Sequence, residues 1–145
     1  DSLPEIELGS TFTIEVTLDV ERPIVNGDLC VTLMNSQGDR VTSLVASDRI
    51  MGLSIQPGEK VIKLSVPDLY LAPGRYFAEV WLDPMIDGIS CDAIFDYPLL
   101  SVVNSGQVTH GLTRPWGSVY SKDAKWSVTE KKETAPAEAS PRVAV

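Results

Sequence analysis

The sequence has almost none of the side chains on which most enzyme mechanisms depend. Its 145 residues include a single histidine, His110, and only two cysteines. No serine stands in a Gly-x-Ser-x-Gly elbow, and a catalytic triad would have to use His110, which falls in a loop-like stretch. Residues 106–117 are glycine-bearing but lack the Lys-Ser/Thr ending of a phosphate-binding loop. We therefore expect a chain that binds rather than catalyses, without a cofactor.

Long apolar runs and amphipathic helices are also missing. No stretch approaches the ~18 apolar residues that a membrane-spanning helix needs. The chain begins at Asp1 without an initiator methionine, so we expect a fragment or a released domain. Its length suffices for one domain with a real core.

The two cysteines, Cys30 and Cys91, each lie inside a strand-like run. Neither has a histidine or a second cysteine at metal-ligand spacing, which argues against a zinc site. A disulfide scaffold of this length would use more cysteines. The favoured interpretation is two reduced thiols in a cytoplasmic protein. A secreted, adhesin-like sandwich with a Cys30–Cys91 disulfide is the alternative.

Basic residues are fewer than acidic ones, with 12 lysines and arginines against 20 aspartates and glutamates. The formal net charge is -8, and residues 128–145 balance three acids against three bases, so the whole excess lies before residue 128. An acidic domain repels phosphate backbones and anionic lipid surfaces. Nucleic acid and direct membrane insertion are therefore not expected.

What the sequence has in abundance is strand-and-turn patterning. Residues 11–20 alternate strictly between apolar and polar side chains, which is typical of a strand with one buried face. Turn residues such as Pro57-Gly58 and Pro73-Gly74 separate further extended runs. The predicted strands number seven to nine and lie at residues 11–20, 29–34, 41–45, 61–66, 76–82, 90–97, 99–103 and 118–121. This spacing predicts an all-β, antiparallel sandwich of the immunoglobulin-like or jelly-roll kind.

The composition changes near the C-terminus. Residues 130–141 contain no large apolar side chain, so they cannot bury enough surface to offset chain entropy. We predict a β-sandwich over residues 1–127 and a disordered tail over residues 128–145.

Acidic side chains leave two alternatives open. Asp83, Asp87 and Asp92 surround one predicted loop, and oxygen ligands suit a hard cation such as calcium. Their spacing matches no EF-hand, so solvation of the loop is the favoured interpretation and no metal is expected. A glycosidase would need two opposed carboxylates, and nothing in the sequence pairs any.

One predicted strand offers a binding surface. In residues 76–82, Phe77, Glu79 and Trp81 share a face opposite the small and aliphatic set. If the aliphatic set faces the core, two aromatic rings flank a carboxylate on the outer surface. Aromatic rings cover the apolar face of a sugar, and a carboxylate accepts hydrogen bonds from its hydroxyls. The alternative is that Trp81 packs under a loop or at a subunit contact.

Neighbouring strands would extend this surface if they pair nearby. They would contribute Thr32, Met34 and Lys63 to the predicted carbohydrate-binding set of Phe77, Glu79 and Trp81.

Several motifs in order carry a resemblance. Residues 53–61 (LSIQPGEKV) lead into 69–76 (LYLAPGRY), followed by 89–94 (ISCDAI), 114–120 (RPWGSVY) and Lys125-Trp126. Over residues 5–126 the chain resembles the C-terminal domain of the ATP-binding subunits of Wzt-type, O-antigen-exporting ABC transporters.

This resemblance implies a cytoplasmic carbohydrate-binding domain, peripheral to the inner membrane, that recognises a finished lipid-linked polysaccharide for export. It also implies a homodimer, formed in some members by exchange of the last strand, which gives Ser118, Val119, Tyr120 and Trp126 an intermolecular role. The full-length subunit would contact a transmembrane subunit and hydrolyse ATP, but this chain lacks the nucleotide-binding motifs. The alternatives are a structural dimerisation domain without a ligand and a sugar-modifying enzyme.

Overall fold

The computed structural model describes residues 2–46, 53–84, 92–106 and 117–131, and these residues form seven strands and no helix. In this described part, therefore, no helix could cross a membrane. The strands are β1 (Glu5–Glu7), β2 (Phe12–Val20), β3 (Gly27–Met34), β4 (Arg40–Ala46), β5 (Gly58–Val66), β6 (Gly74–Pro84) and β7 (Asp92–Val103).

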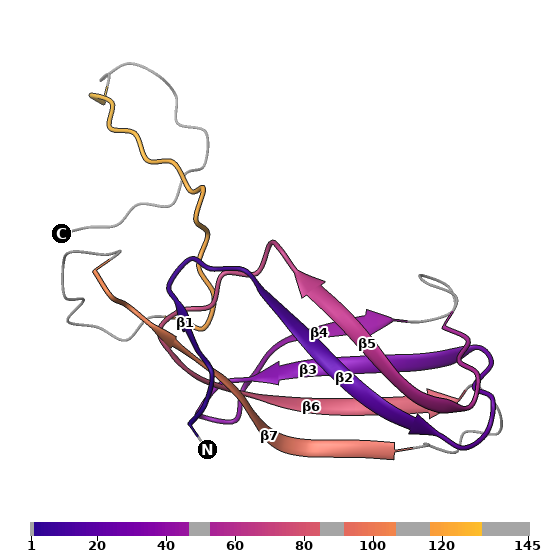
Figure 1. The fold of residues 1–145 in the computed structure, drawn as a ribbon. Helices are drawn as coiled ribbons and strands as arrows, with labels where there is room; N and C mark the ends of the chain where they lie inside the picture. The colour runs from indigo at the N-terminus through magenta and orange to yellow at the C-terminus, as the bar shows by residue number, and fades with distance from the viewer. Residues whose placement is uncertain (1, 47–52, 85–91, 107–116, 132–145) are drawn as a thin grey trace.

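The strands form two layers. Five of them make one sheet in the order β1-β7-β6-β3-β4, and β2 pairs with β5 in a second, two-stranded sheet. The two-stranded sheet crosses in front of the larger one (Figure 1). Every pairing is antiparallel except that of the short β1 with β7. The predicted all-β sandwich is confirmed.

The strand predictions from alternation agree closely with β2 to β6. Two predictions were wrong in detail. Residues 90–97 and 99–103 were expected as separate extended segments, but their described residues belong to one long strand, β7, which is irregular in its middle. Residues 118–121 contribute only an isolated bridge between Val119 and Leu71, not a full strand. Most of the predicted tail, residues 132–145, lies outside the described residues.

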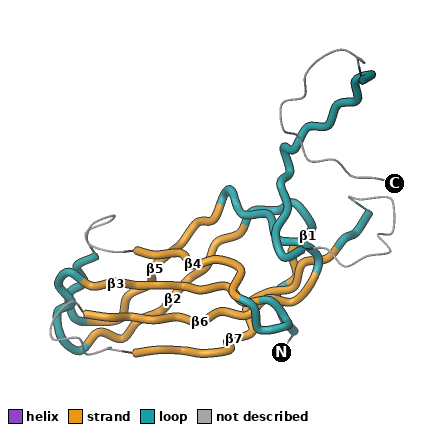
Figure 2. Tube along the Cα trace, turned by 180° about the vertical axis from the view of Figure 1, so that it is seen from behind, coloured by secondary structure: helices purple, strands orange, loops and turns teal. Residues whose placement is uncertain are grey.

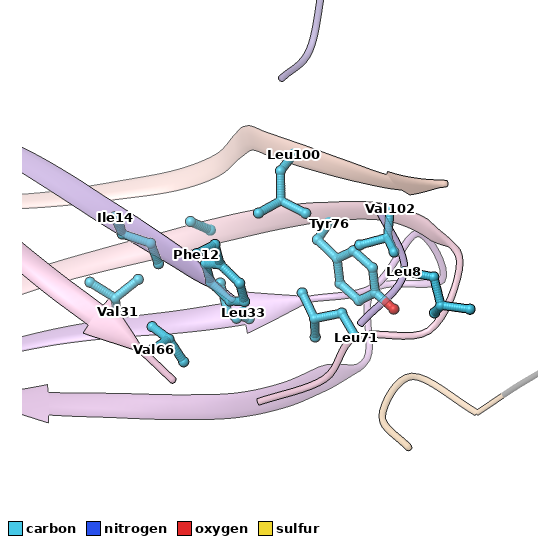
Figure 3. Close-up of a cluster of buried hydrophobic side chains, with 11 residues drawn as sticks. Leu8, Phe12, Ile14, Val31, Leu33, Val66, Leu71, Tyr76, Leu100 and Val102 are labelled. Atoms are coloured by element: carbon cyan, nitrogen blue, oxygen red, sulfur yellow. The ribbon is translucent and has the colours of Figure 1, made fainter. Parts of the chain in front are cut away.

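The core lies between the layers and consists of two apolar clusters. The larger cluster gathers side chains from both sheets (Figure 3), with Leu33 wholly buried at its centre. The smaller cluster includes Val20, Ile24, Leu29 and Leu82. Burying one such aliphatic side chain stabilises the fold by about 1.5–3 kcal/mol. The inward positions of the alternating strands therefore supply most of the driving force for layering.

Tyr76 joins the turn before β6 to the C-terminal segment. Its hydroxyl lies 2.7 Å from the carbonyl oxygen of Ala72 and 3.0 Å from that of Ser118. Gly74, between Ala72 and Tyr76, has a φ of 151°, a conformation that side-chain-bearing residues rarely adopt. The Pro-Gly turn thus brings the tyrosine back over its own preceding backbone.

Candidate functional site

Alternation along β6 fixes which face of the large sheet is exposed. Tyr76, Ala78 and Leu82 are buried in the core. Phe77, Glu79 and Trp81 therefore stand on the opposite side, and each is partly exposed. We call this surface, on the side of the five-stranded sheet away from β2 and β5, the outer face; Figure 2 gives the view from behind.

Strand register places the β3 residues beside this row. Met34 pairs with Phe77, Thr32 with Glu79, and Cys30 with Trp81. Directly paired residues share a face, with Cβ atoms ~4.5–5.5 Å apart. Thr32 and Met34 thus join Phe77, Glu79 and Trp81, as the sequence suggested they would if β3 paired nearby.

Thr32 is the one polar residue of this group that is almost fully covered, with 5% of its surface exposed. Its Oγ1 lies 3.0 Å from Oγ of Ser43 on β4 and 3.7 Å from the sulfur of Cys30. These contacts already use part of its hydrogen-bonding capacity. With so little of its surface exposed, Thr32 offers a ligand little contact area, and its predicted part in carbohydrate binding stays a prediction.

Lys63 does not lie on the outer face, and the expectation that it would was wrong. It belongs to β5, which pairs with β2 in the other sheet. Its Nζ lies 3.1 Å from Oε1 of Glu15, and both side chains are largely exposed. The error arose because sequence order does not show that β5 pairs with β2 instead of β6.

Phe95 belongs to the outer face and was not predicted. Its ring centroid lies 4.9 Å from that of Trp81, and the two ring planes are nearly perpendicular at 89°. Such edge-to-face pairs are attractive by about 0.5–1.5 kcal/mol beyond simple area burial. About half of Phe95 remains exposed, at 54%. The signal in the sequence was the alternation of Ala93 and Phe95, which could not be tied to Trp81 without the register.

We call Phe77, Trp81 and Phe95 the aromatic platform. Phe77 and Trp81 are four residues apart on one strand, about 13 Å at the ordinary rise of a strand. Glu79 stands between them, partly exposed, and no ion pair or hydrogen bond of its side chain is found among the described residues. The platform therefore presents Phe77 on one side and the Trp81–Phe95 pair on the other, with the carboxylate of Glu79 between them.

Three of the four C-terminal residues predicted to act between subunits, Ser118, Val119 and Tyr120, contact the turn at residues 70–72 of their own chain, and strand exchange stays a prediction. The amide of Ala72 donates to the carbonyl of Ser118 at 3.0 Å, and the amide of Tyr120 donates to the carbonyl of Tyr70 at 3.1 Å. Val119 bridges Leu71 between these two bonds. Burial, together with the neighbouring Tyr70 phenol, raises the pKa of Tyr120.

Trp126 behaves quite differently from this anchored segment. It is 95% exposed, and Val128 is 96% exposed. The described tail runs away from the sandwich beyond the anchored residues (Figure 1). The four predicted strand-exchange residues therefore divide into three that are held in place and one that is presented to solvent.

A groove lies between β2 and the start of β7 and encloses about 490 Å³. Its floor is aliphatic, with Leu18, Val80 and Ile94 among the lining residues. Acidic side chains dominate the polar part of the lining, which consists of Thr17, Asp19, Glu21, Arg22 and Asp92. None of the described residues that line it is aromatic, which distinguishes the groove from the platform.

Among the described residues, no group of three or more His, Cys, Asp or Glu side chains could hold a metal ion. Of the acids considered for calcium, Asp83 is the penultimate residue of β6 and Asp92 begins β7, whereas Asp87 lies outside the described residues. His110 and Cys91 also lie outside them. Cys30 is a free thiol.

Fold and surface together define a two-layer β-sandwich domain with an exposed aromatic row on its larger sheet. Among solved structures, the chain is similar to the C-terminal domain of Wzt, with a TM-score of 0.60 and 18% identity. The similarity covers 86% of this chain and 74% of that one. The resemblance inferred from sequence motifs is thus confirmed at the level of the fold. The chain matches no family profile and no curated protein.

Proposed function

We propose that this chain is a carbohydrate-binding module that recognises a lipid-linked, O-antigen-type polysaccharide as cargo for an ABC transporter. The observation that carries the proposal is the aromatic platform with Glu79 between its rings. The shared fold of the Wzt C-terminal domain supports the transport setting. In this role the chain acts without catalysis, at the cytoplasmic side of the membrane, as part of a larger subunit that contacts the membrane component.

The chemistry of the platform suits a sugar chain. The C–H faces of pyranose rings are apolar and flat, so they stack on Phe77 and Trp81. Hydroxyls between two stacked rings would donate to the carboxylate of Glu79, and charge-assisted hydrogen bonds are stronger than neutral ones. A shallow, open face buries little area, so the expected affinity is weak for one chain.

The electrostatic setting favours a neutral or sparsely charged glycan. The protein carries eight excess negative charges, and Glu79 lies at the middle of the platform. A strongly anionic polysaccharide would be repelled on approach.

The decisive experiment is a calorimetric or NMR titration with the long-chain polysaccharide of the source organism, with an unrelated polysaccharide as control. Trp81→Ala is expected to weaken binding at least about tenfold, which corresponds to ~1.4 kcal/mol. Lys63→Ala is the matched control, because its side chain lies on the other sheet and should not affect affinity. Selective binding that survives Trp81→Ala would move the site elsewhere.

A second proposal concerns the homodimer. Residues 124–129 alternate apolar and polar side chains, with Ala124, Trp126 and Val128 on one side. Every described residue from 121 to 131 is exposed. This is the pattern of a strand that lacks a partner, and a fully exposed tryptophan is unusual on a monomer surface.

The groove between β2 and β7 is the acceptor that fits this segment best. Among the described residues, β2 pairs only with β5, which leaves its other edge without a strand partner there. The aliphatic floor suits Trp126 and Val128. The acids that line the groove, Asp19, Glu21 and Asp92, complement Lys125 in the segment and Lys131 just beyond it.

The length of chain between Tyr120 and the segment favours binding to the groove of a second copy over binding to the groove of the same chain. The hydroxyl of Tyr120 lies near Gly9, just before β2 begins. From Phe12 to Val20, β2 covers about 26 Å, and the groove includes residues 16–22 near the strand's far end. Six extended residues from Tyr120 to Trp126 span about 20 Å, so Trp126 of the same chain would stop short of the Val20 end of the groove. The segment of one copy is therefore proposed to bind the groove of another.

If no glycan binds, the structural alternative gains weight. A folded protein that dimerises through residues 124–130 but ignores both polysaccharides would act as a dimerisation domain without a ligand.

A further inference from the structure

Strand β7 contains an extra residue directly beside the aromatic platform. Ala78 pairs with Tyr97, but Val80, two residues on, pairs with Ile94, three residues back. Glu79 is therefore opposed by two residues, Phe95 and Asp96, which is the defining feature of a β-bulge. β7 bends along its length, as bulged strands do (Figure 1).

Asp96, one of the two residues opposite Glu79, has a left-handed backbone. Its φ is 51°, one of two positive values at non-glycine residues in the described part of the chain. Asp and Asn enter this left-handed region more readily than other side-chain-bearing residues, and β-branched residues almost never do.

The bulge decides which side chains of β7 face outward. On its N-terminal side, Ala93 pairs with Trp81 on the outer face, and Phe95 follows two residues later on the same face. On its C-terminal side, Tyr97 pairs with Ala78, a core-facing residue. Without the extra residue, Phe95 and Tyr97 would fall on the same face, because side chains alternate strictly along a regular strand.

A second irregularity restores the alternation. Tyr76 pairs with Leu100 but Phe77 pairs with Pro98, so residue 99 is extra as well. Leu100 and Val102 consequently point into the core. The two bulges together confine the inverted stretch to the part of β7 that borders Phe77 and Glu79.

We propose that Asp96 is a positioning residue, whose left-handed backbone sets the bulge that holds Phe95 perpendicular to Trp81 and so shapes the glycan-binding face. Only the last step of this proposal, the shaping of a glycan-binding face, rests on the proposed function. The placement of Phe95 against Trp81 is a property of the free protein and is testable without any glycan.

The test compares two substitutions at one exposed position. Asp96→Gly keeps the left-handed backbone accessible, whereas Asp96→Val disfavours it without adding charge. In NMR spectra of the 145-residue chain, cross-peaks between the Trp81 indole and the Phe95 ring should persist in Asp96→Gly and be lost in Asp96→Val. Amide cross-peaks from β4, which is separated from β7 by β6 and β3 in the sheet, report whether each variant is folded.

Retention of the Trp81–Phe95 cross-peaks in a folded Asp96→Val variant would overturn the proposal. If Asp96→Val does not fold, Asp96→Ala takes its place, since alanine also disfavours the left-handed region but is not β-branched. Equal intensity of the Trp81–Phe95 cross-peaks in Asp96→Ala and Asp96→Gly would then also overturn the proposal.

A second measurement separates this inference from the proposed function. Affinity for the source organism's polysaccharide, released from its lipid, should fall in the β-branched variant by about as much as in Phe95→Ala and remain unchanged in Asp96→Gly. If the ring contact is lost as expected but wild-type protein binds no polysaccharide, the positioning role holds and the glycan function fails. If wild-type binds and loss of the ring contact leaves affinity unchanged, Asp96 does not shape the binding face.

Discussion

The hydroxyl of Tyr76 lies 2.7 Å from the carbonyl oxygen of Ala72, four residues earlier, and within 3.0 Å of the carbonyl of Ser118. This one group therefore ties a tight turn, the start of β6 and the C-terminal segment together. Tyr76 is 3% exposed, so water cannot replace these bonds easily.

Replacing Tyr76 with phenylalanine is expected to lower the free energy of unfolding by about 1–2 kcal/mol, because buried carbonyl groups lose a donor while packing is kept. Denaturant unfolding at neutral pH measures this. Tyr97→Phe is the matched control, since the Tyr97 side chain is 56% exposed and its hydroxyl should contribute little. Equal stability of the two variants would contradict the assigned role of Tyr76.

The same group makes stability depend on alkaline pH. Burial raises the pKa of Tyr76 from 10.0 to about 12. The folded state thus holds the phenolic proton more tightly than the unfolded state, and this contribution is fully present below pH 10. It is lost as pH rises from 10 toward 12. The stability difference between wild type and Tyr76→Phe should therefore shrink across this window, and a constant difference would refute the linkage.

A prediction for the core follows from Leu33, which is 0% exposed at the centre of the larger cluster. Leu33→Ala should destabilise the protein by about 2–5 kcal/mol, through lost burial and a residual cavity. Val61→Ala on β5, at 53% exposure, should change stability by less than about 0.5 kcal/mol. Thermal or denaturant unfolding of both variants tests whether the core lies where the two sheets meet.

Much of this fold could be predicted from the local sequence pattern. The predictions that failed concern features that the local pattern does not encode. The alternation of residues 11–20 predicted β2 almost to the residue, because strict alternation of apolar and polar side chains indicates a strand with one buried face. β1 was missed, since three residues joined in parallel to the distant β7 leave no periodic signal. The division of β7 into two segments was a misreading of a bulged strand.

The candidate site was predictable along one strand but not across strands. Phe77, Glu79 and Trp81 share a face by alternation alone. Phe95 and Lys63 depended on pairing between strands far apart in sequence, which is decided by tertiary packing. The anchoring of Ser118 and Tyr120 depended on backbone bonds to the loop at Tyr70 and Ala72, and no side-chain pattern encodes these.

Glu79 provides a test of the hydrogen-bonding part of the glycan site. Glu79→Gln keeps the shape of the side chain but removes the charge, so it should weaken binding of the source polysaccharide roughly three- to tenfold, or about 1 kcal/mol. Glu15→Gln is the matched control on the other sheet, where Glu15 pairs with Lys63. The two affinities, measured by calorimetry, should differ; if they agree, Glu79 does not contact the glycan.

The proposed dimer makes the last prediction. If Trp126 and Val128 of one copy fill the groove of another, Trp126→Ser with Val128→Ser should convert a dimer to a monomer in light scattering after gel filtration, without altering the sandwich. Val25→Ser with Val61→Ser, two exposed valines of similar character on the body of the domain, should leave the dimer intact. Salt should weaken association as well, because in this dimer Lys125 and Lys131 would lie near the acids of the groove. Since Ile94 lines the groove floor, Ile94→Asp should also give a monomer while the exposed segment stays unchanged. A dimer that survives both the segment and the groove variants would mean that the two copies meet elsewhere, and the outer face with Trp81 would then be the next surface to test.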